Sequence, residues 1–213
     1  MAQPTDQQWL TRIRAGDTSA MGELLSAYQG RLFNVCLRML SNRDDAAEVT
    51  QEAMLKIVQH IEGFRGKSQL STWMIRIAMN QATTRLRQRK RRLMLSLDGQ
   101  RNGHAHGDQA DALRDTLRDE REPSPAAGVE KQEQLAQLQQ ALAKLEADFR
   151  AVLVLRDIEG LDYQQIADVV EAPVGTVKSR LFRARLALRQ QLQAMEGDSA
   201  DTRSQARPEV QDG

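Results

Sequence analysis

The sequence is short of cysteine, of aromatic side chains and of long apolar runs, and each shortage excludes a class of protein. Cys36 is the only cysteine among 213 residues, so an intramolecular disulfide and a cysteine-based metal site are both excluded. We expect Cys36 to be a small buried core residue, because it lies in an apolar helical stretch. Aromatic residues make up 4% of the chain, so the cores must be built mainly from Leu, Ile, Val, Met and Ala.

Targeting and membrane signals are also missing. The first residues, Met1 to Asp6, contain neither the basic segment nor the apolar segment of a secretory signal peptide. No window approaches the roughly 18 to 20 apolar residues that a membrane-spanning helix needs. We therefore expect a cytoplasmic protein without a membrane span.

Signals of catalysis are equally scarce. Gly63 and Gly66 do not make a nucleotide-binding loop, and no nucleophile lies beside a suitable base in a recognisable motif. His60, His104 and His106 lack cysteine or carboxylate partners at metal-ligand spacing. We expect no catalytic residue, no metal and no cofactor, and so a protein that is not an enzyme.

What the sequence does contain is helical periodicity almost throughout, which predicts an all-α fold. Thr5 and Gln8 form a possible capping box for a short first helix, and Ser41-Asn42 breaks the helix that follows. A third helix is expected from about residue 44 to residue 61, and Ser71 or Thr72 is expected to cap a fourth.

The composition changes abruptly after the fourth helix. From residue 98 to about 130 the chain is rich in Gly, Asp, Arg, Gln, Pro and Ser, and it cannot bury enough apolar surface to fold alone. We therefore predict two small helical domains, at 1–97 and 129–195, joined by a flexible linker at 98–128 and followed by a polar tail at 196–213.

The second domain contains the pattern of a helix-turn-helix. A short helix, Tyr163–Val170, which Asp162 can cap, is followed by a break at 171–173 and then by a basic amphipathic helix. The buried stripe of this second helix is predicted by residues that recur at helical spacing: Val177, Leu181, Ala184 and Leu188. Such a helix can enter the major groove of DNA, where Arg and Lys read guanine. The alternative is an ordinary helical hairpin with a solvated charged face.

The segments Leu155–Ala167 and Ala172–Arg185, with the run Pro-Val-Gly-Thr-Val-Lys-Ser-Arg, resemble region 4 of the extracytoplasmic-function (ECF) sigma factors. The resemblance implies binding to the promoter −35 element. It departs from the family pattern at Glu146, where Pro usually follows Leu, and at Glu171, where Gly is common. By resemblance, the groove contacts are Lys178, Ser179, Phe182 and Arg183, and the supporting phosphate contacts are Arg156, Tyr163 and Thr176.

The first domain independently resembles region 2 of the same family, through Asp45–Ala53, Phe64–Ser68 and Arg76–Asn80. In the family, the helix containing the first of these segments binds the clamp helices of the large polymerase subunit. The pattern predicts that Val49, Ala53, Ile57 and Val58 are buried and that the opposite surface faces outward. By resemblance, the polymerase-binding residues are Asp45, Glu48, Gln51, Glu52, Leu55 and Lys56.

The loop from Phe64 to Ser71 has the composition of a base reader, with two glycines, polar side chains and an aromatic residue at each flank. The family uses this loop to capture a flipped base of the −10 element, and Lys67 replaces an acidic residue often found there. For Trp73 we favour core packing over base stacking. The −10 residues are predicted to be Phe64, Lys67, Ser68, Leu70 and Asn80, with Arg85 and Arg87 of the basic run 85–92 binding phosphate. The alternative is that this basic run is an ordinary solvent-exposed helix surface leading into the linker.

These observations predict an alternative sigma factor that binds RNA polymerase core and promoter DNA and is masked by an anti-sigma protein. Two other classes stay open. A free-standing helix-turn-helix regulator would account for the second domain alone. An adaptor that binds polymerase without reading a promoter would account for the first.

Overall fold

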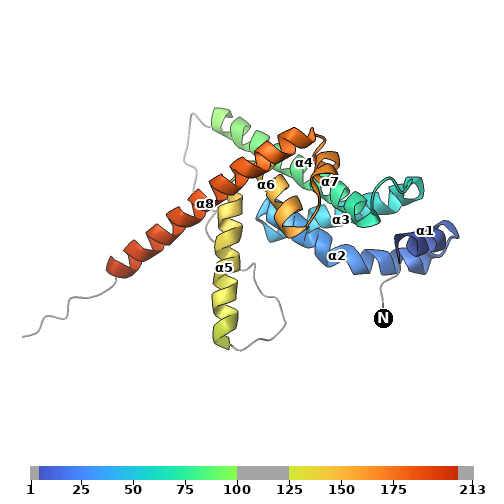
Figure 1. Cartoon of the computed structure of the whole chain (residues 1–213), viewed down its shortest axis with the longest axis horizontal. Coiled ribbons are helices and arrows are strands. Elements are labelled where there is room, and N and C mark those ends of the chain that lie inside the picture. Colours follow the sequence, from blue (N-terminus) through green and yellow to red (C-terminus); the bar gives the residue numbers. More distant parts are fainter. Residues whose placement is uncertain (1–4, 100–124, 206–213) are drawn as a thin grey trace, which may run out of the picture.

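The structure is a computed structural model that describes residues 5–99 and 125–205, and every regular element in these two ranges is helical. Along the chain the helices α1 to α4 form the N-terminal domain and α5 to α8 form the C-terminal domain (Figure 1). The elements are α1 (Asp6–Arg14), α2 (Thr18–Leu40), α3 (Arg43–His60), the 3-10 turn η1 (Ile61–Gly63), α4 (Leu70–Gly99), α5 (Pro125–Ala143), α6 (Ala147–Leu153), the π-helical turn η2 (Val154–Ile158), α7 (Tyr163–Val170) and α8 (Val174–Gln205).

The N-terminal domain is a bundle of α2, α3 and α4, with α1 packed against α2 and η1. Its core contains few aromatic side chains, as expected, and Cys36 is fully buried within it. Burial raises the pKa of the Cys36 thiol to about 11, so the thiol stays protonated at neutral pH. The largest fully buried side chains of the domain are Leu24, Leu32, Val35, Met39, Val49, Ile57, Ile61, Leu70, Met74 and Ile75.

Most helix ends lie where the capping signals predict. The Thr5–Gln8 capping box is present in full, with both reciprocal hydrogen bonds. The break after α2 is confirmed, because Ser41 adopts a left-handed conformation (φ 53°) and the Asn42 side chain caps α3.

The predicted start of α4 was wrong. This helix begins at Leu70, before both Ser71 and Thr72, and the Leu70 backbone N–H donates to the Asp6 carboxylate at 2.7 Å. The carboxylate that satisfies this helix end therefore comes from 64 residues earlier in the chain.

The burial of α3 agrees with the predicted stripe except at one position. Val49, Ala53 and Ile57 are fully buried, but Val58 is 42% exposed. The next residue of a helix is rotated by about 100°, which places Val58 on the outward side with Leu55. The outer surface of α3 is thus more apolar than predicted.

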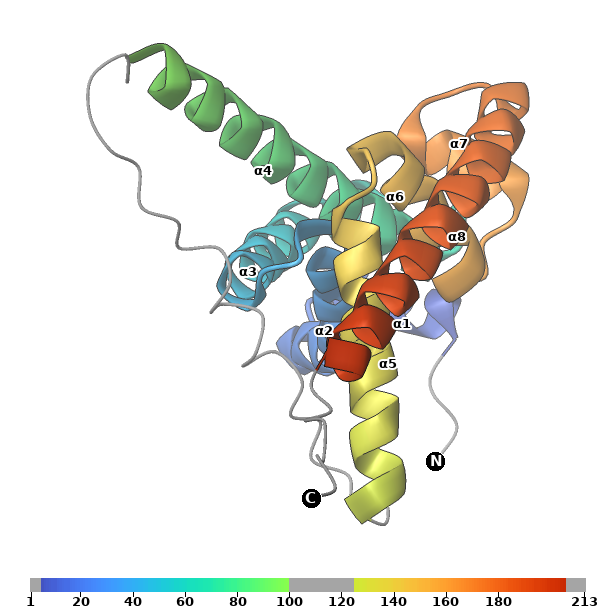
Figure 2. The same cartoon turned by 90° about the vertical axis from the view of Figure 1, so that its left-hand side faces the viewer.

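In the C-terminal domain, α6 and α7 pack against α8, and α5 crosses α8 (Figures 1 and 2). Asp162 caps α7 as predicted, and Gln165 completes a capping box with it. The predicted stripe of α8 is confirmed at Val177, Leu181 and Ala184, which are buried, while Leu188 is partly buried.

Helices extend into the range predicted as linker from both sides, because α4 continues to Gly99 and α5 begins at Pro125. Residues 100–124 lie outside the described residues. Likewise, α8 continues to Gln205, past residue 195 where the tail was predicted to begin, and 206–213 lie outside the described residues. None of the helices in the described ranges has the length and apolar content to cross a membrane.

The two domains are packed together rather than apart. Helix α2 contacts α5, α6 and η2, and α4 contacts α6 and α7. The C-terminal end of α4 projects beyond this packed region (Figures 1 and 2). The sequence predicted two domains but contained no indication that they would share an interface.

Candidate functional site

Helix α8 presents a cationic and polar surface that is held outward by its buried stripe. Lys178, Ser179 and Arg183 are exposed, and the Phe182 ring lies among them with 73% of the residue exposed. Val177 and Leu181 alternate with these residues and are buried, which fixes the rotation of the helix. The four predicted groove residues therefore share one accessible surface.

The three predicted phosphate-binding residues lie near the start of this surface, where an aromatic ring gathers cations. The Arg156 guanidinium lies 5.0 Å from the centroid of the Tyr163 ring, and Lys178 Nζ lies 5.5 Å from the same centroid. Arg156 also donates to the carbonyl of Leu161 at 2.7 Å. Tyr163 thus holds two cations in one place by cation–π attraction. Thr176 accepts through its carbonyl from the Ser179 hydroxyl at 2.9 Å.

The turn between α7 and α8 contains Glu171, where the family commonly has Gly. This residue adopts a left-handed conformation (φ 53°), the conformation for which glycine is usual at a helix C-terminus. The turn therefore keeps the backbone geometry expected of glycine, with Glu171 in its place.

The loop at residues 64–69 separates its predicted base-reading residues into exposed and buried sets. Lys67 and Ser68 are exposed, whereas Phe64 is 6% exposed and Leu70 is fully buried. The Phe64 ring packs on Trp73, with centroids 5.2 Å apart and planes tilted by 47°. The structure thus places Phe64 and Leu70 under the loop, as its support.

Asn80 and Arg87 are exposed on α4, but Arg85 is not free for phosphate. Its guanidinium forms ion pairs with Asp45 at 2.9 Å, Glu48 at 2.8 Å and Glu52 at 3.2 Å, all on α3. Hydrogen bonding to the Arg85 guanidinium lowers the pKa of Glu48. Arg85, which was predicted to bind the −10 element, is therefore ion-paired with three residues predicted to bind polymerase.

The rest of the predicted polymerase-binding set lies on the outer surface of α3. Leu55 is 59% exposed, Gln51 is exposed, and Lys56 donates to Gln81 of α4 at 2.9 Å. Together with Val58 this surface combines apolar and polar groups, which suits a helix-packing interface.

The −10 loop (residues 64–69) and α4 face α7 and the turn before α8 across the domain interface. A cavity of about 590 Å³ is lined by Lys67, Ser68 and Arg76 of the N-terminal domain and by Gln164 and Asp168 of α7. A second cavity, of about 380 Å³, is lined by Asn80 and Arg87 on one side and by residues of α6, α7 and α8 on the other.

Several polar contacts close this interface, and sequence reasoning found none of them. Arg31 pairs with Glu159 at 2.6 Å, and Arg76 pairs with Glu171 at 2.7 Å. The buried Arg150 side chain donates to the carbonyl of Met39 in the other domain. The interdomain partners lie 95 to 128 residues apart, beyond the reach of any local pattern.

Comparison with known proteins identifies both domains. The family model "Sigma-70 region 2" matches residues 24–92, and "Sigma-70, region 4" matches residues 135–188. The RNA polymerase sigma-H factor of Pseudomonas aeruginosa is 36% identical over 196 residues, which cover 92% of this chain and 97% of that protein. The ECF RNA polymerase sigma-E factor of Escherichia coli K12 is 33% identical, over 91% of this chain and 97% of that protein.

The chain belongs to the ECF RNA polymerase sigma factors. The matches span both domains, whereas the regulator and the adaptor each accounted for only one. As a sigma factor the protein directs promoter-specific transcription initiation by RNA polymerase, and it is an initiation factor rather than an enzyme.

Two solved structures share the fold of this chain. The sigma factor RpoE of Bartonella quintana, solved in complex with the anti-sigma factor NepR, aligns with a TM-score of 0.59 and 25% identity, covering 81% of this chain and 96% of that one. CnrH, solved with the cytosolic domain of CnrY, aligns with a TM-score of 0.58 and 20% identity over 90% of this chain and 99% of that one. At 20% identity, the likeness to CnrH shows that the fold is shared and no more.

Proposed function

We propose that this sigma factor reads a promoter in two parts, a −35 duplex through α8 and an unpaired −10 base through the loop at 64–69 and the adjoining surface of α4. The observation that carries the proposal is the outward surface of α8. There Lys178, Ser179, Phe182 and Arg183 are exposed on a helix whose opposite stripe is buried.

In the duplex-reading step, α8 enters the major groove with its N-terminal turns. Arg183 and Lys178 supply donors for guanine edges or phosphates, Ser179 supplies a hydroxyl, and the Phe182 ring supplies an apolar contact for a thymine methyl. The cations gathered on Tyr163 bind the flanking phosphates and set the position of the helix.

In the base-reading step, the separated strand lies on the loop and α4. Lys67, Ser68 and Asn80 are the exposed polar groups that can donate to the edge of an unstacked base. Phe64 and Leu70 support the loop from below, and Arg87 supplies a phosphate contact. Arg85 acts differently from the prediction, holding α3 and α4 together.

Polymerase binding uses the outer surface of α3. Leu55 and Val58 provide its apolar centre, while Gln51, Glu52 and Lys56 provide its polar rim. The target is the pair of clamp helices of the large polymerase subunit, and catalysis is left to the polymerase. Because polymerase is the partner, the protein acts in the cytoplasm.

Promoter binding requires the two domains to separate. The −35 and −10 elements lie about 25 base pairs apart, which is roughly 85 Å of B-form DNA at about 3.4 Å per base pair. In the structure, Lys67 and Ser68 of the −10 loop line the same cavity as Gln164 and Asp168 of α7, the helix that precedes α8. The packed arrangement is therefore the form that precedes binding to polymerase and promoter. An anti-sigma protein binds this free form and keeps it inactive; the similar sigma factor RpoE was solved in complex with the anti-sigma factor NepR.

The test is a promoter-opening assay with core polymerase from the native host. A library of promoter DNA is transcribed with and without the protein, and the initiated transcripts are sequenced. Initiation from a two-part motif is expected, with at least about a tenfold loss for Arg183→Ala and for Asn80→Ala. The matched control is Arg12→Ala, since Arg12 is on α1 and pairs with Asp17 and Glu23 away from both readers.

Two results would contradict the proposal. If transcripts depended on the protein but showed no −35 preference, the role of α8 would be wrong. If the folded protein bound core polymerase without supporting initiation from any library member, promoter reading itself would be wrong.

A further inference from the structure

The base-reading loop at residues 64–69 is held at both of its ends by α1. At the start of the loop, Arg14 Nη2 donates to the carbonyl oxygen of Phe64 at 2.7 Å. At its end, the backbone N–H of Leu70 donates to the carboxylate of Asp6 at 2.7 Å. Asp6 is the first residue of α1 and Arg14 is the last, so opposite ends of one helix hold opposite ends of the loop.

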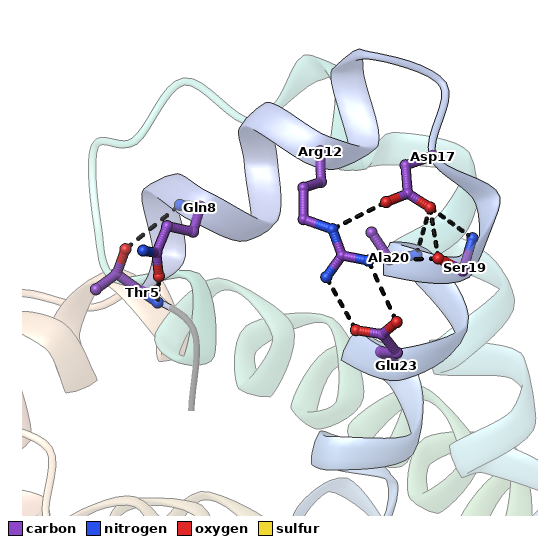
Figure 3. Close-up of polar contacts among 7 residues, drawn as sticks. All are labelled: Thr5, Gln8, Arg12, Asp17, Ser19, Ala20 and Glu23. Carbon is purple, nitrogen blue, oxygen red and sulfur yellow. Dashed lines mark hydrogen bonds and ion pairs between the residues drawn. The ribbon is translucent and has the colours of Figure 1, made fainter. Parts of the chain in front are cut away.

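Helix α1 is itself fixed in position, which allows it to hold another segment. Its N-terminus is closed by the capping box of Thr5 and Gln8 (Figure 3), and Trp9 and Ile13 are buried in the domain core. Arg12 extends from α1 toward the start of α2 and joins the two helices (Figure 3).

Arg12 donates to Asp17 at 2.9 Å and forms a two-pronged contact with Glu23 at 2.9 and 3.2 Å (Figure 3). Asp17 in turn caps α2 by accepting from the N–H groups of Ser19 and Ala20. These contacts attach α1 to α2 and involve no residue of the loop. Trp9 and Ile13 stay buried without Arg12 and keep α1 in place, so Arg12 provides an internal control for Asp6 and Arg14.

The loop needs such support because of its own composition. Residues 65–69 are exposed, and Gly66 adopts a positive φ of 70°, which a glycine reaches without strain. A segment of this kind samples many conformations, and ordering it during base capture lowers affinity. Contacts that hold its ends in place before DNA arrives remove part of that loss.

We propose that Asp6 and Arg14 are positioning residues for base capture, which hold the two ends of the loop so that Lys67 and Ser68 are presented in a single arrangement. The proposal rests on the proposed −10 role of the loop. Both residues lie outside the segment 24–92 that matches region 2, so the match to that family model does not contain them.

The experiment uses holoenzyme assembled from core polymerase and full-length variants. The probe is a single-stranded oligonucleotide that contains the non-template −10 sequence found in the opening assay, together with versions in which each base is replaced. For every variant we would measure affinity for the probe, preference among the four bases, affinity for −35 duplex, affinity for core and thermal stability.

Asp6→Ala and Arg14→Ala are each expected to weaken probe binding about fivefold and to reduce base preference by a similar factor. Asp6→Asn keeps an oxygen acceptor for the Leu70 N–H and is expected to bind within about twofold of wild type. Arg12→Ala is expected to lower thermal stability without changing base preference. Binding to core and to −35 duplex is expected to stay within about twofold of wild type for all of these variants.

Three results would overturn the proposal, in distinguishable ways. Unchanged base preference in both alanine variants would show that α1 does not position the loop. Equal losses for the probe, core and −35 duplex would show a general effect on folding rather than positioning. A wild-type holoenzyme without base preference would instead refute the −10 role of the loop.

Discussion

Arg150 joins the ends of two helices across the domain interface, and replacing it tests how that interface is held. The residue is 6% exposed, and its guanidinium donates to the carbonyls of Met39, Ala143 and Leu145. Met39 lies in the last turn of α2, and Ala143 is the last residue of α5. The last carbonyls of a helix lack partners within the helix, and a cation satisfies them well.

The replacement Arg150→Met keeps most of the side-chain volume and removes every donor. It leaves three carbonyl acceptors without their partner, and each buried unsatisfied group costs about 1–3 kcal/mol. Part of this loss is offset, because a buried cation no longer has to be desolvated. Burial already lowers the pKa of Arg150 to about 10, which leaves it charged at neutral pH. The expected net loss is about 3 kcal/mol.

The assay is chemical and thermal unfolding followed by circular dichroism, with Arg189→Met as the control because Arg189 is exposed on α8. A loss of about 3 kcal/mol lowers the unfolding temperature by roughly 6–12 °C in a protein of this size. The control is expected to stay within about 0.5 kcal/mol of wild type. A decrease of less than about 2 °C for Arg150→Met would refute the view that this side chain satisfies the helix ends.

Three further predictions concern single contacts. Arg85→Ala leaves three carboxylates on α3 without their cation. We expect urea unfolding to show a free energy of unfolding that is lower by about 1 kcal/mol, and roughly 0.5 M salt to reduce this difference. An unchanged urea midpoint would show that the ion pairs of Arg85 do not stabilise the domain. The hydrogen bond from Ser19, followed by that from Arg12, lowers the pKa of Asp17 from 3.8 to about 2. The ionised Asp17 carboxylate therefore contributes its full stabilisation above pH 3.8 and loses it as the pH falls toward 2. In acid titrations, the difference in free energy of unfolding between wild type and Asp17→Asn should shrink over that interval; a constant difference would contradict this. Gly160 has a φ of 71° and no atom within 4 Å of an added Cβ. Gly160→Ala should therefore lower the free energy of unfolding by about 1 kcal/mol through backbone strain alone. An unchanged thermal unfolding temperature would show that the left-handed backbone at this position is not strained by alanine.

Local signals along the chain were enough to predict the helical elements and the capped helix starts at Thr5, Asn42 and Asp162, but not the start of α4 or the ends of α4 and α8. Capping depends on residues within one turn of a helix, which is why the Thr5–Gln8 box and the Asp162 cap are readable from the amino-acid order alone. The helical period likewise identified the buried stripe of α8, and the pair at 41–42 identified the break after α2. The resemblance to regions 2 and 4 was confirmed by the comparisons, and the roles it implied for individual residues remain predictions.

Which charged groups meet depends instead on the packing of the helices. Arg85 looked like one cation of a basic run, but the packing of α4 on α3 places it among three carboxylates. Asp6 caps a helix that starts 64 residues later. Arg150 satisfies a carbonyl in the other domain. Such contacts arise between helices rather than from the spacing within any one of them, so no periodic pattern along the chain contains them.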